Sequence, residues 1–287
     1  MKRVLLCGQR SFASKGLREM LENHDGVELF CFSRGEVMEI GNEISGDVYN
    51  MPLNPYLKKG FDVVVNYIYI SDCDVEKNLN YLRSLVAFCK QEGIKHLIHL
   101  STISVYANDL KYVNEDTDFE RDVNRKGLYS ALKVMCDKYL ESEENENFQV
   151  TYIRPGFIVE DRNVIRLAGI LVTLPLNMGV LMGNKKTSLP LVNRRKMNKA
   201  MVEIIMNDNP NRVYLMLENK KGTKYQYVKE WTNRKVICLP KGLSILLAKS
   251  LKFFHVFNEN KVELVKGLFK ETYFDSSKTE QTLNIQF

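Results

Sequence analysis

The chain has 287 residues, of which 45% are hydrophobic and 26% are charged, and its net charge is +6 at pH 7. These fractions are those of an ordinary globular protein, so they exclude disordered, collagen-like and low-complexity classes. The length suits one large domain or two small ones. The thinly spread positive charge favours a solvated basic surface, or an anionic small substrate, over nucleic acid.

The six cysteines form no C-x-x-C pair, and the chain starts directly on an apolar strand with no signal peptide before it. We therefore expect reduced thiols in a cytoplasmic protein, with no disulfide and no metal site. Two apolar stretches, 164–182 and 242–257, are too interrupted or too short to span a membrane. Packing in the core or in a lid is expected for both, with a basic amphipathic helix on a membrane surface as the alternative for the second.

The first two-thirds of the chain alternates strand and helix signals. Strands are predicted at 3–7, 27–32, 61–65, 94–100 and 150–153, with a weaker segment closing at 46–48, and helices at 14–23, 75–91 and 128–141. Continuous apolar strands separated by amphipathic helices predict a parallel sheet that is covered on both faces. The predicted fold class is therefore α/β, a Rossmann-type doubly wound parallel sheet.

After Arg154-Pro155-Gly156 the pattern loosens, with a helix predicted at 198–206 and a strand at 212–216. We expect a nucleotide-binding core over 1–160, which also receives part of 186–217, and a smaller C-terminal substrate lobe made mainly of 161–287. Ligands of such sheets bind outside the carboxyl ends of the strands, so the lobe is expected to fold over that edge.

The turn after the first strand runs Gly8-Gln-Arg-Ser11-Phe12-Ala-Ser14. A strand that ends in glycine and opens a helix places backbone N–H groups and the positive end of the helix dipole beside a bound pyrophosphate. Only Gly8 is glycine here, and the small residues Ser11 and Ser14 take the next two places. An ordinary strand–helix turn fits as well, and residues 13–16 lack the Gly-Lys-Ser/Thr order of a P-loop.

Tyr129 and Lys133 are four residues apart in a predicted helix, so they share one face. An ammonium near a phenol stabilises the phenolate, which lowers the pKa of the tyrosine and lets it exchange a proton with a substrate hydroxyl or carbonyl. The strand at 94–100 delivers Ser101 and Thr102 to the carboxyl edge of the sheet, where a hydroxyl can bind the reacting oxygen. A surface helix pair and a strand-end cap are the purely structural alternatives.

Three segments follow one another in an order and at intervals that resemble the extended short-chain dehydrogenase/reductase family, the NAD-dependent epimerase/dehydratase group: Ser101-Thr-Ile-Ser-Val-Tyr106, Tyr129-x-x-x-Lys133 and Tyr152-Ile-Arg-Pro-Gly156. Further segments extend the resemblance over nearly the whole chain: Gly46-Asp47-Val48, Asp62-Val-Val-Val-Asn66 and Phe274-Asp-Ser-Ser-Lys278.

The resemblance implies a catalytic set and a cofactor site. Tyr129 would be the catalytic acid/base, Lys133 would lower its pKa and bind the nicotinamide ribose, and Thr102 would supply the partner hydroxyl. The cofactor would be NADP or NAD. Its implied contacts are Gly8, Ser11, Phe12, Ser14, Arg34, Asp47, Val48, Asn66 and Lys133, with the pyrophosphate at the first four, the adenine at Asp47 and Val48, and Asn66 along the cofactor's path.

Three features depart from the family pattern. Ser11 and Ser14 replace two glycines of G-x-x-G-x-x-G, which is expected to change the affinity for the cofactor. Ile103-Ser104 stands where sugar-nucleotide 4,6-dehydratases carry an Asp-Glu pair, so dehydration is not expected. Arg34 follows the second strand, which offers no carboxylate for the ribose, and this favours NADP(H) over NAD.

The implied function is that of an NAD(P)-dependent oxidoreductase acting on a nucleotide-activated sugar or another small phosphorylated substrate, of the 4-keto reductase or epimerase type. Arg194 or Arg195 is expected to meet the substrate diphosphate. The alternative is a catalytically inactive dinucleotide-binding scaffold or regulator, which the missing glycines motivate. Neither nucleic acid nor a membrane surface is expected as a partner, and a homodimer stays an open alternative.

Overall fold

The computed structural model describes residues 1–70, 73–160, 171–174, 177–181, 184–218, 223–257, 261–262, 265–266, 269 and 271–287. Part of the apolar stretch 164–182, including the whole of 164–170, lies outside the described residues.

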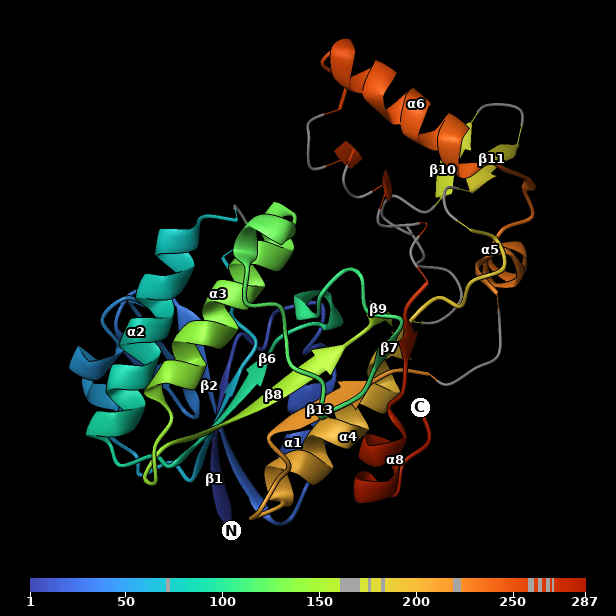
Figure 1. Ribbon diagram of the computed structural model, residues 1–287. Coiled ribbons are helices and arrows are strands. Elements are labelled where there is room, and N and C mark those ends of the chain that lie inside the picture. The colour runs from blue at the N-terminus through green and yellow to red at the C-terminus, as the bar shows by residue number, and fades with distance from the viewer. Residues whose placement is uncertain are drawn as a thin grey trace.

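The centre of the molecule is an eight-stranded sheet with the strand order β13-β8-β6-β5-β1-β2-β4-β3 (Figure 1). The strands are β1 (Lys2–Cys7), β2 (Val27–Arg34), β3 (Met38–Ile40), β4 (Glu43–Gly46), β5 (Val63–Asn66), β6 (His96–Leu100), β8 (Gln149–Pro155) and β13 (Val213–Met216). All neighbours pair in parallel except β3, which returns antiparallel along β4. Because the chain leaves β1 toward β2 and later continues from β5 on the other side, the sheet is doubly wound, which confirms the predicted fold class.

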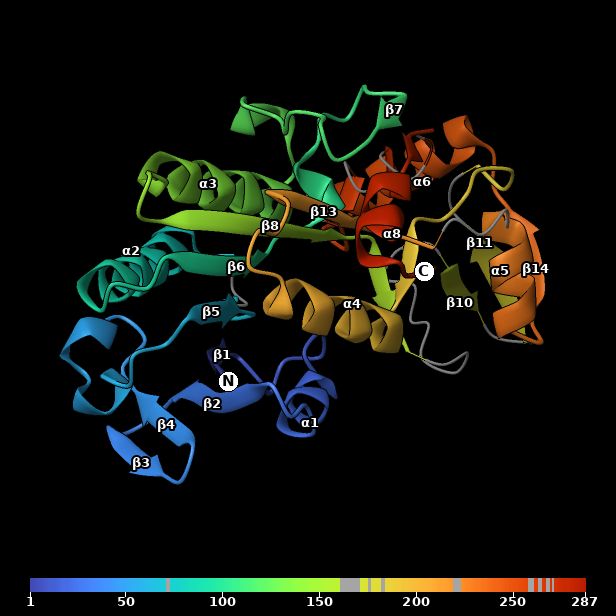
Figure 2. The same ribbon diagram turned by 90° about the horizontal axis from the view of Figure 1, so that it is seen from below.

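Four helices cover the two faces of this sheet (Figure 2). The helices α2 (Val75–Gln91) and α3 (Leu128–Glu143) pack together on one face, and α1 (Leu17–Glu22) and α4 (Arg194–Met206) pack together on the other. Each pair encloses its own apolar core against the strands. The central strands are therefore buried on both faces, which is why they are continuous apolar runs in the sequence.

Two helices show how local signals set the element ends. The helix α2 covers the predicted span 75–91, and the Asp74 side chain caps its first turn by accepting the N–H of Lys77. The helix α1 begins at Leu17, three residues later than predicted. Gly16 precedes it with a φ of 88°, a left-handed conformation that cannot continue a right-handed helix. The turn after β1 therefore extends over residues 8–16.

Beyond β8 the chain builds a smaller lobe beside the carboxyl end of the sheet (Figure 1). The lobe contains β10 (Leu171–Leu174), β11 (Met178–Leu181), β14 (Lys235–Cys238), α5 (Lys224–Trp231) and α6 (Lys241–Phe253). Two short parallel pairs lie outside the main sheet, namely β9 (Phe157–Val159) with β12 (Leu191–Asn193) and β7 (Tyr112–Val113) with β15 (Tyr273–Phe274). The final helix α8 (Ser277–Leu283) packs on α4 and β13, so the chain ends on the core.

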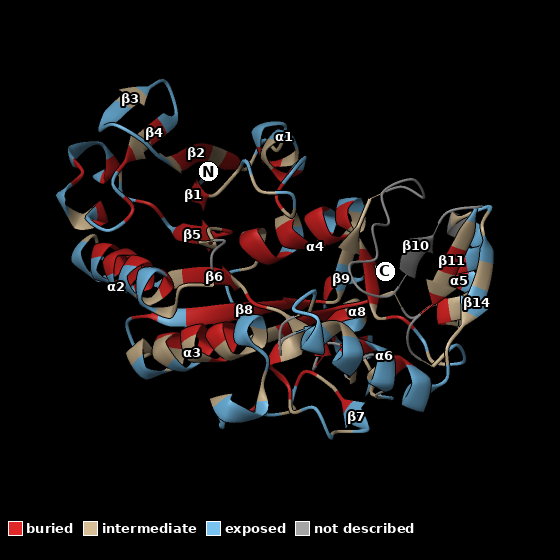
Figure 3. Ribbon diagram, turned by 90° about the horizontal axis from the view of Figure 1, so that it is seen from above, coloured by how far each residue is buried: buried red, intermediate tan, exposed pale blue. Residues whose placement is uncertain are grey.

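The packing of α6 differs from the core or lid packing expected for 242–257. Leu246 and Phe253 are 62% and 79% exposed, whereas the small residues Ser244 and Ala248 are buried (Figure 3). The sequence marked 242–257 as an apolar stretch, and the structure shows a helix over Lys241–Phe253 with most of its large apolar side chains exposed. Within the described parts of the chain, no helix is both long and apolar enough to cross a bilayer.

Candidate active site

Tyr129 and Thr102 meet beyond the carboxyl end of β6. Thr102 lies two residues after this strand and accepts the N–H of Ser104, so its side chain caps the short 3-10 helix Ile103–Val105. Tyr129 is the second residue of α3, and its hydroxyl lies close enough to Thr102 for hydrogen bonding with that side chain to lower its pKa. The Tyr129 ring also packs edge-on against Tyr69, with 5.7 Å between the ring centroids. The structure therefore brings two of the predicted catalytic residues into contact.

The pKa of Tyr129 is shifted in the direction opposite to the predicted one. Although the Tyr129 side chain is 44% exposed, desolvation around its hydroxyl raises this pKa above its ordinary value, and hydrogen bonding with Thr102 opposes the rise. The predicted lowering depended on Lys133, but the Lys133 ammonium donates to the carbonyl oxygen of Leu100 at 2.9 Å and lies 5.3 Å from the centroid of the Tyr69 ring. At neutral pH Tyr129 therefore keeps its proton.

A buried ionic network holds α3 against the strands. The Asp137 carboxylate accepts hydrogen bonds from the Ser101 hydroxyl at 2.9 Å and from the Arg154 guanidinium at 3.1 Å. Arg154 also donates to the hydroxyl of Tyr106 at 3.0 Å. Removing one partner of such a pair costs about 3–5 kcal/mol, because the other charge is left buried. The network thus fixes the helix that carries Tyr129, a role that the sequence motifs did not reveal.

Asn66 is buried at the end of β5, and its amide is used inside the protein. The side-chain nitrogen pairs with Nδ1 of His99 at 3.1 Å. The side-chain oxygen accepts the N–H of Ile68 at 2.9 Å and the hydroxyl of Tyr81 at 2.8 Å. These contacts shape the backbone that follows β5, at the edge where the cofactor is expected.

The turn after β1 is closed by side chains. Gly8 has a φ of 88°, and an added Cβ would lie 3.0 Å from backbone atoms of Tyr67 and Ile68, so only glycine fits there. The fully buried hydroxyl of Ser14 donates to the carbonyl oxygen of Gly8 at 2.8 Å. It also pairs with the hydroxyl of Ser11 at 2.9 Å. The two serines that replace glycines are therefore bonded to each other and to the glycine that remains.

Arg194, the first residue of α4, reaches the same turn. Its buried guanidinium lies 3.4 Å from the carbonyl oxygen of Phe12 and 4.8 Å from the centroid of the Phe12 ring, and it forms an ion pair with Glu160. Asn198, further along α4, donates to the carbonyl oxygen of Lys15 at 2.9 Å. Arg195 is exposed. Arg194 and Arg195 were expected at the substrate diphosphate, but Arg194 lies against the turn after β1, where the cofactor pyrophosphate is expected.

The remaining predicted residues lie at the ends of β2 and β4. Arg34 is exposed at the end of β2, and Val48 is buried. The Asp47 carboxylate accepts the N–H of Tyr49 at 2.9 Å and the side-chain N–H of Asn50 at 2.6 Å. Asp47 therefore shapes the turn in which it stands.

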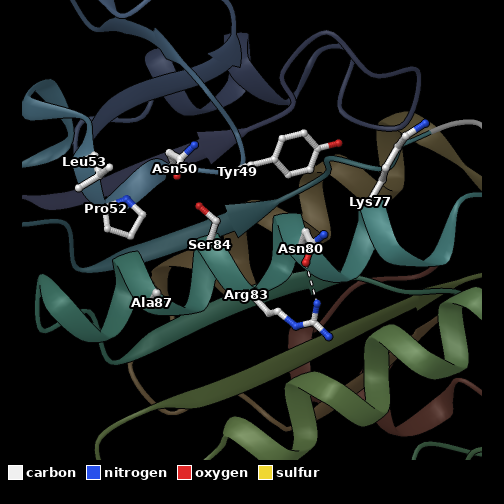
Figure 4. Close-up of a pocket in the computed structure, with 9 residues that line it drawn as sticks. All are labelled: Tyr49, Asn50, Pro52, Leu53, Lys77, Asn80, Arg83, Ser84 and Ala87. Atoms are coloured by element: carbon white, nitrogen blue, oxygen red, sulfur yellow. Dashed lines mark hydrogen bonds between the residues drawn. The ribbon is translucent and has the colours of Figure 1, made fainter.

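A hollow of about 660 Å³ opens between α2 and the segment 49–53 (Figure 4). Its lining combines the ring of Tyr49 with the polar ends of Lys77, Asn80 and Arg83, and the Arg83 guanidinium donates to Asn80 at 2.6 Å. Because Tyr49 directly follows Val48, the hollow begins next to the residues expected to meet the adenine. The described residues that line it include none of the predicted catalytic or cofactor contacts.

The chain was compared with known proteins. The profile of the NAD dependent epimerase/dehydratase family matches residues 5–159, which is more than half of the chain. No protein of a curated sequence collection matches.

Several solved structures share the fold. The terminal R domain from the myxalamid PKS-NRPS biosynthetic pathway has a TM-score of 0.74 at 17% identity, with 99% of this chain and 85% of that chain covered. UDP-N-acetylglucosamine 4-epimerase from Bacillus cereus gives 0.68 at 15% identity, covering 100% and 94%. The dTDP-glucose 4,6-dehydratase from Bacillus anthracis, in complex with NAD, gives 0.69 at 13% identity, covering 100% and 91%.

At these identities the structural likeness establishes the fold, and the profile match establishes the family. The doubly wound sheet agrees with this fold, and the succession of Thr102, Tyr129 and Lys133 along the sequence agrees with this family. This protein belongs to the NAD dependent epimerase/dehydratase family.

Proposed function

We propose that this protein is an NAD-dependent oxidoreductase that interconverts a keto group and an alcohol on a nucleotide-activated sugar. The observation that carries the proposal is the hydrogen bond between Tyr129 and Thr102 beyond the carboxyl end of β6. Support for the substrate class comes from proteins of the same fold, which include UDP-N-acetylglucosamine 4-epimerase and MoeE5 solved with UDP-glucose and NAD.

Tyr129 is proposed as the group that transfers the proton. Because burial raises its pKa, the hydroxyl is protonated at neutral pH and can donate to a carbonyl oxygen that becomes an alcohol. Thr102 would hold the same oxygen through its hydroxyl. Lys133, bonded to the carbonyl oxygen of Leu100, would orient the cofactor ribose beside Tyr129.

The turn after β1 fits the diphosphate of a dinucleotide in two respects. The Gly8 position has no room for a side chain, and the Arg194 guanidinium places a positive charge beside Phe12. Gly8, Ser11, Phe12 and Arg194 are therefore proposed to line the diphosphate site, and Ser14, whose hydroxyl is fully buried, is proposed to hold the turn from inside. The bound cofactor would supply hydride exchange with the sugar carbon.

The adenosine end of the cofactor is proposed to lie along Arg34, Asp47 and Val48, with Asn66 shaping the sheet edge beneath it. The family description names NAD, whereas exposed Arg34 suits the 2′-phosphate of NADP. Replacing Arg34 by Ala should weaken NADPH binding more than NADH binding if this arginine contacts the cofactor. The smaller lobe, mainly 161–287, is proposed to bind the sugar.

Calorimetric titration with NADH and NADPH tests the cofactor site, and oxidation of the bound nucleotide by nucleotide-linked 4-keto sugars tests the reaction. Tyr129→Phe should leave cofactor binding unchanged and lower turnover by about 10²- to 10⁴-fold. Tyr56→Phe, at an exposed position away from the sheet edge, is the matched control. Unchanged turnover in Tyr129→Phe would refute the assigned role, and failure to bind either cofactor would refute the proposed enzyme.

A dinucleotide-binding scaffold is the second candidate, and the replacement of two family glycines by Ser11 and Ser14 motivates it. A scaffold would bind NADH or NADPH in the titration but would oxidise neither with any 4-keto sugar. Both candidates bind the cofactor, and in both this binding is insensitive to Tyr129→Phe. Turnover with 4-keto sugars therefore separates the candidates.

A further inference from the structure

The helix α6 turns its large apolar side chains to solvent. Leu243, Leu246, Phe253 and Phe254 are 51%, 62%, 79% and 70% exposed, and Leu247 lies beside them at 41%. Leu246 and Leu247 lie three and four residues after Leu243, and Phe253 and Phe254 follow seven residues after Leu246 and Leu247, so the five side chains share one side of the helix, with Ser250 between the two groups. Figure 1 shows α6 at the outer end of the smaller lobe, away from the main sheet.

The fully buried residues of α6 are small, and of its large apolar residues only Ile245 and Leu251 are half-buried. Ser244 and Ala248 are fully buried, and the Ser244 hydroxyl lies 3.4 Å from the carbonyl oxygen of Leu239. A helix whose apolar stripe served the fold would bury Leu246 and Phe253 and expose the serine. Burial of one such leucine or phenylalanine stabilises by about 1.5–3 kcal/mol, so the exposed stripe is a large unused source of binding energy.

Positive charge accompanies the stripe. The span Lys241–Phe253 contains three lysines and no acidic residue. At its carboxyl end, a hollow of about 500 Å³ is lined by Lys252, His255 and Lys261 together with Val256 and Phe257. Two lysines and a histidine line this hollow, and the exposed rings of Phe253 and Phe254 stand next to it in the chain.

We propose that α6 docks the protein onto a membrane surface that contains anionic phospholipids. The helix would lie in the plane of the interface, with its leucines and phenylalanines among the upper acyl chains. Lys249 and Lys252 would face the headgroups, and the hollow lined by Lys252, His255 and Lys261 would take a lipid phosphate. This proposal is independent of the proposed reaction, because it uses no residue of the Tyr129 site.

The combination of features favours a lipid surface over a protein groove. The five exposed large apolar side chains lie at both ends of α6, at 243–247 and 253–254. Lys249 lies between these two groups in the sequence, and Lys252 and Lys261 line the hollow at the carboxyl end of the helix. An interfacial helix needs this arrangement, with an apolar side and a lysine-bearing side. The net charge of +6 for the whole chain adds a long-range attraction to an anionic surface.

Cosedimentation of the full chain with vesicles tests the proposal. We expect binding to vesicles of equal parts phosphatidylcholine and phosphatidylglycerol, weaker binding when salt is raised, and little binding to phosphatidylcholine alone. The double variant Leu246→Ser, Phe253→Ser should lower the partition coefficient at least about tenfold. Leu53→Ser is the matched control. Leu53 is as exposed as Phe253, but it lies in the 3-10 helix Met51–Leu53 and outside the smaller lobe that carries α6.

The charge requirement has its own variant pair. Lys249→Gln together with Lys252→Gln should weaken binding to the anionic vesicles about tenfold, and exposed Lys186→Gln should leave it nearly unchanged. All variants change exposed residues, so unchanged thermal unfolding verifies that each one is folded. Absence of binding to anionic vesicles would overturn the proposal. A second outcome would also overturn the proposal. If the protein does not bind vesicles but dimerises or captures an acidic protein, and the double variant abolishes this, the stripe binds that partner instead of a membrane.

Discussion

The hydroxyl of Ser14 donates a hydrogen bond of 2.8 Å to the carbonyl oxygen of Gly8. The contact joins the beginning of the turn after β1 to the residue at which the family pattern has its third glycine. A turn that relies on glycine leaves this space to the backbone and the ligand, whereas here a side chain fills it. The conformation of the turn therefore depends on the serine.

The first prediction is that Ser14→Gly lowers the stability of the protein and weakens NADH binding, although glycine is the residue of the family pattern at this position. The Gly8 carbonyl and the Ser11 hydroxyl each lose one hydrogen bond but keep a bond to a backbone N–H, and together with the added backbone freedom this costs about 1–2 kcal/mol in the free energy of unfolding. We expect the urea unfolding midpoint to fall and NADH binding to weaken. Ser14→Ala separates the hydrogen bond from backbone freedom and should lose about 1 kcal/mol. Tighter NADH binding by Ser14→Gly would show that the hydroxyl obstructs the site.

The second prediction concerns the two neighbouring arginines of α4. Arg194 is buried against Phe12 and paired with Glu160, whereas Arg195 is exposed. Arg194→Met keeps the aliphatic length but removes the charge beside the turn, so NADH binding should weaken about tenfold. Arg195→Met is the matched control and should leave the dissociation constant unchanged in calorimetry. Equal effects of the two variants would argue against a diphosphate contact at Arg194.

Much of the fold could be predicted because it depends on local signals. The helix α2 has the predicted bounds, since the Asp74 cap and the apolar periodicity both lie within its own segment. The β-branched run at Val63–Val65 likewise reveals a strand that is buried on both faces. The order and spacing of these segments were enough to predict the parallel sheet and the proximity of Tyr129 to Thr102.

The parts that could not be predicted depend on residues far apart in the sequence. Arg194 meets Phe12 only because α4 packs against α1, and no local pattern marks that contact. The buried pair of Asp137 and Arg154 depends in the same way on α3 meeting β8. The direction in which Lys133 points, and with it the pKa of Tyr129, follows from the Leu100 carbonyl rather than from helical spacing.

The third prediction is a loss of stability in mild acid. Burial, aided by the charge of Lys2, lowers the pKa of His96 to about 4, and burial lowers that of His99 as well. The unfolded chain takes up these protons near pH 6.5, but the folded chain resists until near pH 4 at His96. Between these two pH values the unfolded state binds more protons than the folded state. The free energy of unfolding is therefore highest above about pH 6.5 and decreases as the pH falls toward 4.

Urea unfolding measured across this pH range checks the prediction. His96→Gln keeps a hydrogen-bonding partner for the Thr151 hydroxyl, which lies 2.9 Å from the His96 ring, and should flatten the decline. His255→Gln changes an exposed histidine and is the control. A decline as steep in His96→Gln as in the unaltered chain would mean that other groups cause it.

The fourth prediction tests how Thr102 acts on Tyr129. The hydrogen bond from Thr102 lowers the pKa of Tyr129, against the larger rise caused by burial. Thr102→Val removes the hydroxyl at nearly constant volume, so the pKa of Tyr129 should rise further, whereas Thr102→Ser should keep it close to that of the unaltered chain. Nuclear magnetic resonance of ring-labelled tyrosine measures the titration, and the signal missing in Tyr129→Phe identifies the residue.

The unaltered protein, Thr102→Val and Thr102→Ser together distinguish a proton-transfer pair from a structural cap. If Thr102 served only to cap the helix at Ile103–Val105, Thr102→Val would lower stability without moving the Tyr129 titration. A shift to higher pH in Thr102→Val but not in Thr102→Ser shows that the hydroxyl stabilises the phenolate. Because a tyrosine with a raised pKa holds its proton at neutral pH, reduction should proceed at a constant rate there and slow only where Tyr129 ionises. That alkaline limit should move upward in Thr102→Val together with the titration of Tyr129.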